Sequence, residues 1–221
     1  MKSLIIFDFD GVVVDSEMWA TQALADAMTR VGCPTTFDDA LNHYMGRRWT
    51  DTVIEMEARH NRPMPPGFID QAKAEAAVLM EANVQAIAGL EAFLDRFEDT
   101  ARCIASSSDL PYIGRSLEMI GLAQRFEHRF SAQDMARAKP HPDIYLLAAR
   151  SMRREPADCI VIEDSITGVT AGMAAGMLTI GLCAGGHIRS GHAEKLTAAG
   201  ADHVVASYEE VTRIVSPLVS A

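Results

Sequence analysis

The segment that is most informative for the fold is Leu4-Ile5-Ile6-Phe7-Asp8-Phe9-Asp10-Gly11-Val12-Val13-Val14-Asp15-Ser16. Here an apolar run typical of a buried strand ends in two aspartates, Asp8 and Asp10. Side chains alternate along a strand, so both carboxylates are expected on the same side. At about 4 Å, two ionised carboxylates repel by roughly 4 kcal/mol at an effective dielectric constant near 20. The pattern therefore predicts a cation at this place, unless the strand end and its acids simply lie in water.

The composition is that of a globular protein with a sizeable core. The chain has 221 residues, 48% of them hydrophobic, which suits one large domain or a core with a smaller insertion. No apolar segment has the length of a membrane span and no signal-peptide pattern precedes the first strand, so we expect a cytoplasmic protein without membrane partners. A formal net charge of -10 argues against nucleic acid as a partner.

Apolar runs of the strand type recur along the chain, and each is followed by a turn and a helical pattern. They cover residues 4–9, 102–105, 159–162, 178–182 and 203–205. Strands that alternate with helices predict an α/β fold with a doubly wound parallel sheet.

The first two predicted strands lie too far apart for a single crossover. The intervening pattern is helical throughout, with breaks at Gly32-Cys33-Pro34 and at residues 62–67. We therefore expect a core domain formed by residues 1–14 and 84–221, and an inserted helical cap formed by residues 15–83.

Polar clusters follow the predicted strands, and ligands of an open parallel sheet bind outside the carboxyl ends of its strands. Ser106-Ser107-Ser108 follows the second strand and precedes a helix with Pro111 in its first turn. Hydroxyls and backbone N–H groups at such a turn suit a phosphate. The alternative is plain helix capping by Ser108 or Asp109.

A second cluster, Glu163-Asp164, ends another buried strand. A helix N-cap uses one acid at most, so the other acid is expected to bind a metal ion or to orient a ligand, and carboxylate oxygens suit Mg²⁺. Lys139 lies in a loop before a predicted helix at residues 142–152. A lone lysine of this kind is either a solvated surface charge or a counter-charge for the carboxylates and a phosphate.

Together these clusters provide what phosphoryl transfer through an aspartyl-phosphate intermediate requires. Asp8 is the expected nucleophile, and Asp10 is placed to protonate the leaving oxygen and to deprotonate water. Mg²⁺ would be held by Asp8, the Asp10 carbonyl and Asp164. The phosphoryl oxygens would be held by Ser106, the Ser107 amide and Lys139.

The four clusters resemble, in order, the signature motifs of the haloacid dehalogenase superfamily. The matching segments are Asp8-Phe9-Asp10-Gly11-Val12, the strand end at Ser106, Lys139-Pro140-His141-Pro142-Asp143, and Ile162-Glu163-Asp164-Ser165 with Gly168-Val169. The resemblance implies a Rossmann-like core with a helical cap inserted after the first motif. It points to the branch with phosphoglycolate phosphatase, small sugar-phosphate phosphatases and β-phosphoglucomutase.

By this resemblance each motif residue has an implied role. Asp8 is the nucleophile, Asp10 the acid and base, and Ser106 the phosphate hydroxyl. Lys139 balances charge and Asp164 binds the metal ion, with Glu163 in the same acidic motif. The implied metal group is therefore Asp8, Asp10, Glu163 and Asp164, and the implied cofactor is Mg²⁺.

The resemblance also separates the possible reactions. Dehalogenases of the superfamily lack the second aspartate of the first motif, so Asp10 argues against dehalogenation. β-Phosphoglucomutase carries a cap histidine soon after this motif, whereas residues 17–21 contain none. We therefore expect a phosphatase of a small phosphorylated metabolite, a sugar phosphate or sugar-acid phosphate. A phosphosugar mutase and a binding protein with negligible turnover are the alternatives.

Specificity is expected to come from the cap. Gly46, Arg47 and Arg48 form the loop that we expect over the site, where an arginine would meet an anionic group of the substrate. His187 lies in a glycine turn after the fourth strand and belongs either to the rim of the site or to an exposed turn without function. We expect a monomer or a weak homo-oligomer.

Overall fold

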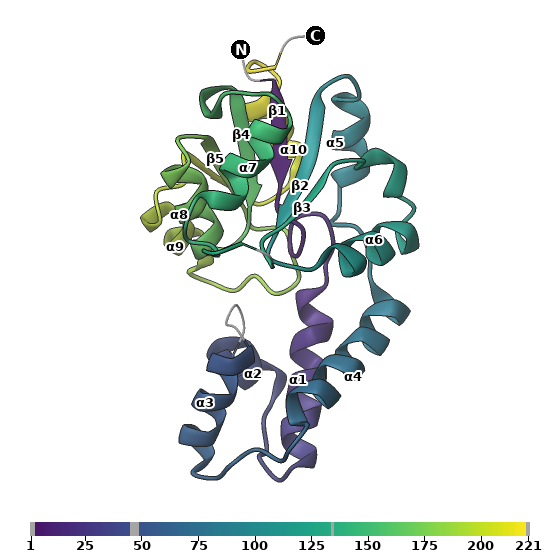
Figure 1. The fold of residues 1–221 in the computed structure, drawn as a ribbon, viewed down its shortest axis with the longest axis vertical. Helices are drawn as coiled ribbons and strands as arrows, with labels where there is room; N and C mark the ends of the chain where they lie inside the picture. Colours follow the sequence, from purple (N-terminus) through teal and green to yellow (C-terminus); the bar gives the residue numbers. More distant parts are fainter. Residues whose placement is uncertain (1–2, 45–48, 134, 220–221) are drawn as a thin grey trace. The chain divides into compact units, whose positions relative to one another are not determined.

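The structure is a computed structural model and describes residues 3–44, 49–133 and 135–219. The chain forms two compact units, Met1–Asp15 with Gln85–Ala221, and Ser16–Val84 (Figure 1). The first unit is made of two segments, which meet where the chain passes into the second unit and where it comes back. The backbone N–H of Asp15 donates to the carbonyl of Gln85 at 2.9 Å, and that of Ile87 donates to the carbonyl of Val13 at 3.0 Å.

The first unit is built on a six-stranded parallel sheet in the order β3-β2-β1-β4-β5-β6 (Figure 1). The strands are β1 (Leu4–Phe7), β2 (Ala101–Ser106), β3 (Arg129–Ser131), β4 (Cys159–Glu163), β5 (Leu178–Leu182) and β6 (His203–Val205). The predicted α/β fold with a doubly wound parallel sheet is therefore confirmed. The opening strand β1 lies between β2 and β4, with Phe7 in register with Ile104 and Ile162.

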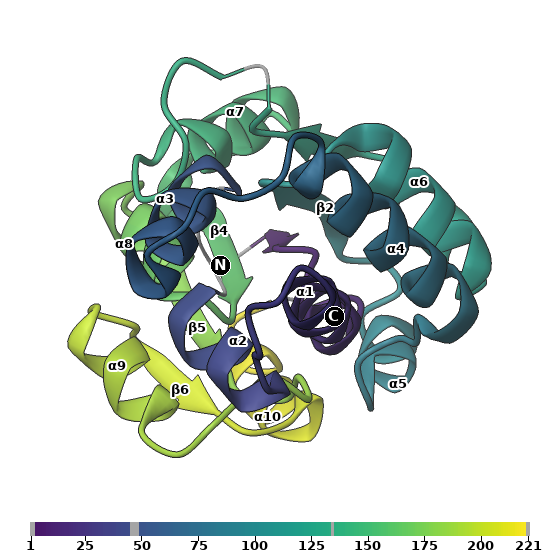
Figure 2. The ribbon, with the colours of Figure 1, turned by 90° about the horizontal axis from the view of Figure 1, so that it is seen from below.

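Both faces of the sheet are covered by helices, so β1 is apolar at every position. The helices of this unit are α5 (Leu90–Arg96), α6 (Leu110–Met119), α7 (Asp143–Ser151), α8 (Ile166–Ala174), α9 (His192–Ala198) and α10 (Tyr208–Val215). Figure 2 shows α7 and α8 on one side of the sheet and α5 and α10 on the other. On one face Leu4 and Ile6 pack with Tyr145 of α7. On the other face Phe7 packs against Phe93 of α5 in an edge-to-face arrangement, with the ring centroids 6.0 Å apart.

Among its described residues, the second unit has four helices, α1 (Glu17–Arg30), α2 (Phe37–Tyr44), α3 (Trp49–His60) and α4 (Phe68–Asn83). Helix α1 packs against α2 and α4. The small core between the helices consists of Leu24, Ala25, Ala27, Met28, Cys33, Ala40, Tyr44, Met56, Phe68 and Ala72. Within the described part of the chain, no helix combines the length and the apolar character that a bilayer crossing requires.

Two strand predictions differ from the structure. The edge strand β3 was not predicted, because its three residues, Arg129-Phe130-Ser131, show no apolar run. The opening strand ends at Phe7 instead of Phe9. The chain turns there, because the carbonyl of Phe9 accepts hydrogen bonds from the N–H groups of Val13 and Val14, and Gly11 takes a φ of 77°.

Candidate active site

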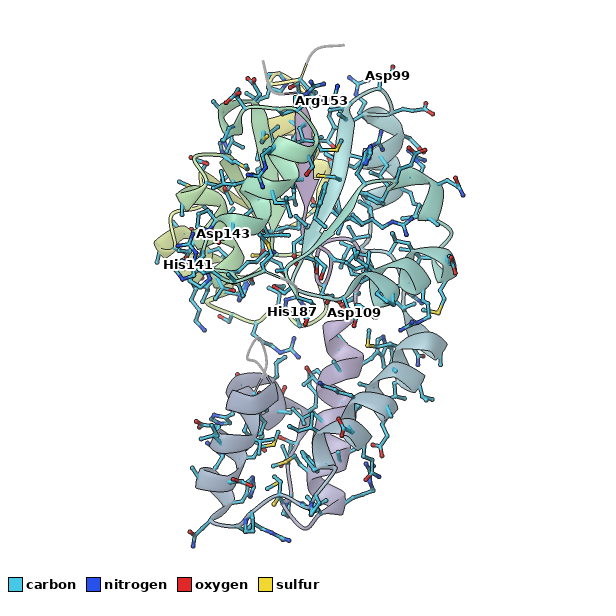
Figure 3. All side chains as sticks on the ribbon, viewed as in Figure 1. Asp99, Asp109, His141, Asp143, Arg153 and His187 are labelled. Carbon is cyan, nitrogen blue, oxygen red and sulfur yellow. The ribbon has the colours of Figure 1, made fainter. Side chains whose placement is uncertain are left out.

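The carboxyl ends of β1, β2 and β4 bring three of the four polar clusters to one end of the first unit. Asp8 follows β1, Ser106 ends β2, and Glu163 ends β4, which makes them neighbours across adjacent parallel strands. Figure 3 labels Asp109 and His187 at this end, whereas Asp99 lies at the opposite end. The site is therefore assembled by the sheet from segments that lie far apart in the sequence.

The fourth cluster, the loop with Lys139, contributes to the same site through the side chain of Lys139, which is only 5% exposed. Its Nζ atom lies 2.6 Å from Oδ1 of Asp8 and 2.8 Å from Oε1 of Glu163, and it donates to the carbonyl of Ala105 at 3.3 Å. The ammonium group also lies 4.9 Å from the ring centre of Tyr145. The alternative of a solvated surface lysine is therefore wrong, and Lys139 joins β1, β2 and β4.

Glu163 is fully buried and both of its carboxylate oxygens accept hydrogen bonds. Oε1 accepts from Lys139 and from the hydroxyl of Tyr145 at 3.1 Å. Oε2 accepts from the N–H group of Ser165 at 2.7 Å and from its hydroxyl at 2.9 Å. Gly168 leaves room for this carboxylate, because a Cβ atom there would overlap it. These contacts hold Glu163 in place and orient Lys139.

Asp8, Glu163 and Asp164 form a buried acid cluster, in which one oxygen of each carboxylate lies within 4.8 Å of the others. Burial raises the pKa of Asp8, and this effect outweighs the lowering by Lys139. Burial and then the charge of Glu163 raise the pKa of Asp164. Burial alone would lower the pKa of Lys139, but Asp8 and Glu163 hold it well above its usual value.

The charges of this cluster do not balance within it. Three carboxylates face one ammonium group, which leaves two negative charges when all are ionised. A divalent cation would neutralise this excess, and hard carboxylate oxygens are the ligands that Mg²⁺ prefers. The acid cluster therefore fits the cofactor expected from the sequence.

The side chain of Asp10 is held by α6 and the loop before it. Its Oδ2 atom accepts from the hydroxyl of Ser108 at 2.5 Å, and its Oδ1 atom from the hydroxyl of Tyr112 at 2.9 Å. Strand alternation does not relate Asp10 to Asp8, because β1 ends at Phe7, before both residues. Plain helix capping is confirmed for Asp109, which accepts from the N–H group of Tyr112 at 2.7 Å.

The serines that follow β2 differ in burial. Ser106 is buried, and its hydroxyl oxygen accepts from the N–H group of Ser108 at 3.0 Å. Ser107 is exposed, and its carbonyl accepts from the side chain of Gln133. The predicted cap residues Gly46, Arg47 and Arg48 lie outside the described residues.

Sequence reasoning gave no site role to two tyrosines that the structure brings to this place, and it left the role of His187 open. Tyr112 and Tyr145 donate to site carboxylates, but each lies on a helix where an aromatic residue is usually part of the core. His187 is buried rather than exposed, with Nε2 at 3.0 Å from Oδ2 of Asp164. Of the two tyrosines, only Tyr145 offered a signal in the sequence, through its position in the first turns of the helix after Lys139.

Fold and site together define an α/β enzyme with an acid cluster and a buried lysine at the carboxyl ends of its central strands. The family profile described as haloacid dehalogenase-like hydrolase matches residues 5–182. The chain belongs to this family, and the resemblance of its four motifs is confirmed.

Two curated relatives are phosphatases. The chain is 30% identical to hexitol phosphatase B of Escherichia coli (strain K12) over 180 residues, which cover 79% of this chain and 81% of the relative. It is 25% identical to 6-phosphogluconate phosphatase of the same strain over 185 residues, 83% of either chain.

Two solved structures share the fold over nearly the whole length. A conserved haloacid dehalogenase-like protein of unknown function from Agrobacterium tumefaciens str. C58 superposes with a TM-score of 0.91 at 32% identity and covers 100% of both chains. A HAD family hydrolase from Deinococcus radiodurans R1, with bound phosphate and sodium, gives a TM-score of 0.83 at 30% identity, covering 99% of this chain and 98% of the other.

Replacing Lys139 by methionine is expected to destabilise the metal-free protein strongly. The change removes the ammonium group and leaves Asp8 and Glu163 buried without it, a loss of about 3–5 kcal/mol in the free energy of unfolding. Urea denaturation in the presence of EDTA measures this difference. The matched control is Arg137→Met, since Arg137 forms an exposed ion pair with Asp143 and should change stability little. Equal effects of the two substitutions would contradict the role given to Lys139.

The stability of the Asp164→Asn variant relative to the wild type is expected to depend on pH. A carboxyl whose pKa is raised on folding contributes stability that is complete below its unfolded pKa and is lost as the pH rises through the folded value. Asparagine does not ionise, so the variant should gain stability relative to the wild type as the pH rises above the pKa of an unfolded aspartate, about 4. Urea denaturation in EDTA at a series of pH values tests the sign. If the free energy of unfolding of the variant minus that of the wild type stays constant or falls with pH, burial does not penalise Asp164.

Proposed function

We propose that this protein is a Mg²⁺-dependent phosphatase that hydrolyses a small phosphorylated metabolite through an aspartyl-phosphate intermediate. The observation that carries the proposal is the position of Lys139 between Asp8 and Glu163, inside a buried acid cluster. A buried ammonium group that contacts one oxygen of a carboxylate is suited to bind phosphoryl oxygens as they approach that carboxylate.

In the first half of the reaction, an oxygen of Asp8 attacks phosphorus and the bond between phosphorus and the ester oxygen breaks. The leaving oxygen takes a proton from Asp10. In the second half, water attacks the phosphorus of the aspartyl phosphate and gives a proton to Asp10. Inorganic phosphate departs, and the carboxylate of Asp8 and the proton on Asp10 are restored.

The hydrogen bonds of Asp10 suit this double role. Ser108 and Tyr112 donate to its two oxygens and hold the group on the α6 side of Asp8. A hydroxyl group can both donate and accept, so these two partners can hydrogen-bond Asp10 in its ionised form and in its protonated form.

Mg²⁺ would be held by the carboxylates of Asp8 and Asp164 and by the Asp10 carbonyl, with Glu163 supporting the cluster through Lys139. When bound, the ion supplies positive charge that neutralises the phosphoryl group during transfer. Ser106, the Ser107 amide and Lys139 hold the phosphoryl oxygens and fix the phosphorus in line with Asp8.

The substrate class is a sugar phosphate or a sugar-acid phosphate. The names of the two Escherichia coli phosphatases, one for hexitol phosphates and one for 6-phosphogluconate, support this range. We place Gly46, Arg47 and Arg48 at the leaving group, with an arginine meeting an anionic group of the substrate. The cytoplasmic location and the monomeric or weakly associated state stay predictions.

Hydrolysis of p-nitrophenyl phosphate tests the reaction. We expect phosphate release that requires Mg²⁺, is abolished by EDTA, and falls to background in Asp8→Asn because the amide is not a nucleophile. Asp10→Asn should lower kcat by roughly 10²–10⁴-fold, as expected for a general acid and base. The matched control is Asp99→Asn at the opposite end of the first unit (Figure 3). Activity that persists in Asp8→Asn or in EDTA would contradict the proposal.

A panel of sugar phosphates and sugar-acid phosphates tests the substrate class. We expect phosphate release from members of the panel, and in Arg47→Ala or Arg48→Ala a larger rise in KM for sugar-acid phosphates than for neutral sugar phosphates, because only the former carry a second anionic group. The comparison uses the ratio of the two KM values in each variant. Isomerised product without released phosphate would instead establish a phosphosugar mutase.

A further inference from the structure

The segment that runs from the end of β5 to the first residue of α9 contacts Asp164 twice. Nε2 of His187 lies 3.0 Å from Oδ2 of the Asp164 carboxylate, and the imidazole is only 8% exposed. Nε2 of His192, the first residue of α9, lies 2.6 Å from the backbone carbonyl of the same aspartate. A carbonyl oxygen can only accept, so His192 donates from Nε2, while Nε2 of His187 lies within hydrogen-bond distance of the carboxylate. The carboxylate and the backbone of Asp164 are therefore both restrained by this segment.

Two glycines leave the space that the imidazole of His187 occupies. A Cβ atom on Gly185 would lie 2.7 Å from ring atoms Cε1 and Nδ1, and one on Gly11 would lie 2.8 Å from Cε1. Gly11 has a φ of 77°, which by itself favours glycine, but Gly185 does not have a positive φ. The glycine at position 185 is therefore explained by the ring next to it and not by its backbone conformation.

The segment is also anchored to the rest of the first unit. Both carboxylate oxygens of Asp15 accept from the N–H group of Gly186 at 3.1 Å, and the N–H group of Cys183 donates to the carbonyl of Val205 at 2.7 Å. The residue next to His187 is thus tied to the end of the opening segment, and the imidazole is held from a fixed backbone.

From these contacts we propose that His187 is a positioning residue for the metal site. Its Nε2–H group donates to Oδ2 of Asp164 and holds the carboxylate in the orientation in which it joins Asp8 and Glu163. A carboxylate that is already oriented loses less conformational freedom when it binds a cation, and partners of this kind typically change metal affinity by about 10–100-fold. This inference rests on the proposed function, because it concerns the Mg²⁺ site of that reaction.

Direct metal binding tests the role of His187 without any assay of activity. Mn²⁺ serves as the probe for the Mg²⁺ site, and the loss of the electron paramagnetic resonance signal of the free ion gives the dissociation constant. The amide nitrogen of glutamine reaches close to the position of imidazole Nε2, whereas that of asparagine ends near Nδ1. We expect His187→Asn to raise the dissociation constant about 10–100-fold, and His187→Gln to stay within a few-fold of the wild type. His203→Asn, at an exposed histidine of β6, is the matched control.

Gly185→Ala provides a second test that leaves the histidine in place. The added methyl group forces the imidazole away from its position, so this variant should bind Mn²⁺ as weakly as His187→Asn. Gly114→Ala in α6 is the control, because a Cβ atom there has no neighbour closer than 3.6 Å. This test also stands if His187→Asn does not fold, which thermal unfolding of the metal-free variants would show.

The outcomes separate the inference from the proposed function. Wild-type affinity for Mn²⁺ in both His187→Asn and Gly185→Ala overturns the role of His187 and leaves the Mg²⁺-dependent phosphatase intact. Equal losses in His187→Asn and His187→Gln also overturn it, because the donor at the Nε2 position would then be irrelevant. A wild-type protein that binds no Mn²⁺ and hydrolyses phosphate esters in EDTA overturns both.

Discussion

The arrangement of the site depends on one buried ammonium group. Lys139 contacts Asp8, Glu163 and the carbonyl of Ala105, and so links the ends of three adjacent strands. Charged groups are costly to bury, and the cost is met only when partners are close and well oriented. Tyr145 and Ser165 complete the set by donating to Glu163. Lys139 therefore links the ends of the three strands, and it also stabilises the ionised carboxylates of Asp8 and Glu163.

The remaining acids are divided by their surroundings into two kinds. Asp8 and Asp164 lie in the acid cluster, where burial raises their pKa values and the excess of negative charge favours the binding of a cation. Asp10 receives two hydroxyl hydrogen bonds on the side of α6. Placing neighbouring carboxyl groups in different environments is the usual way to give them different chemical roles. The division of work that we propose between Asp8 and Asp10 follows from this difference.

The sequence predicted those parts of the fold and site that depend on local pattern. The apolar runs predicted five of the six strands, and the strand ends predicted which polar clusters meet, because parallel strands share one carboxyl edge. The sequence did not reveal the contacts of tyrosine and histidine side chains, because these residue types are common both in functional sites and outside them. Tyr112 and Tyr145 look like core aromatics, and His187 follows two glycines that resemble a surface turn. Strand β3 was missed because three residues at a sheet edge carry too little apolar pattern.

In the proposed reaction, the carboxylate of Asp8 becomes phosphorylated during turnover. The most direct test is to quench the wild-type enzyme with borohydride while it hydrolyses a phosphate ester, and to map the reduced peptide by mass spectrometry. Borohydride reduces an acyl phosphate to an alcohol, so we expect homoserine at position 8 only when substrate and Mg²⁺ are both present. Unmodified Asp8 during rapid turnover, or reduction at another carboxyl group, would contradict it.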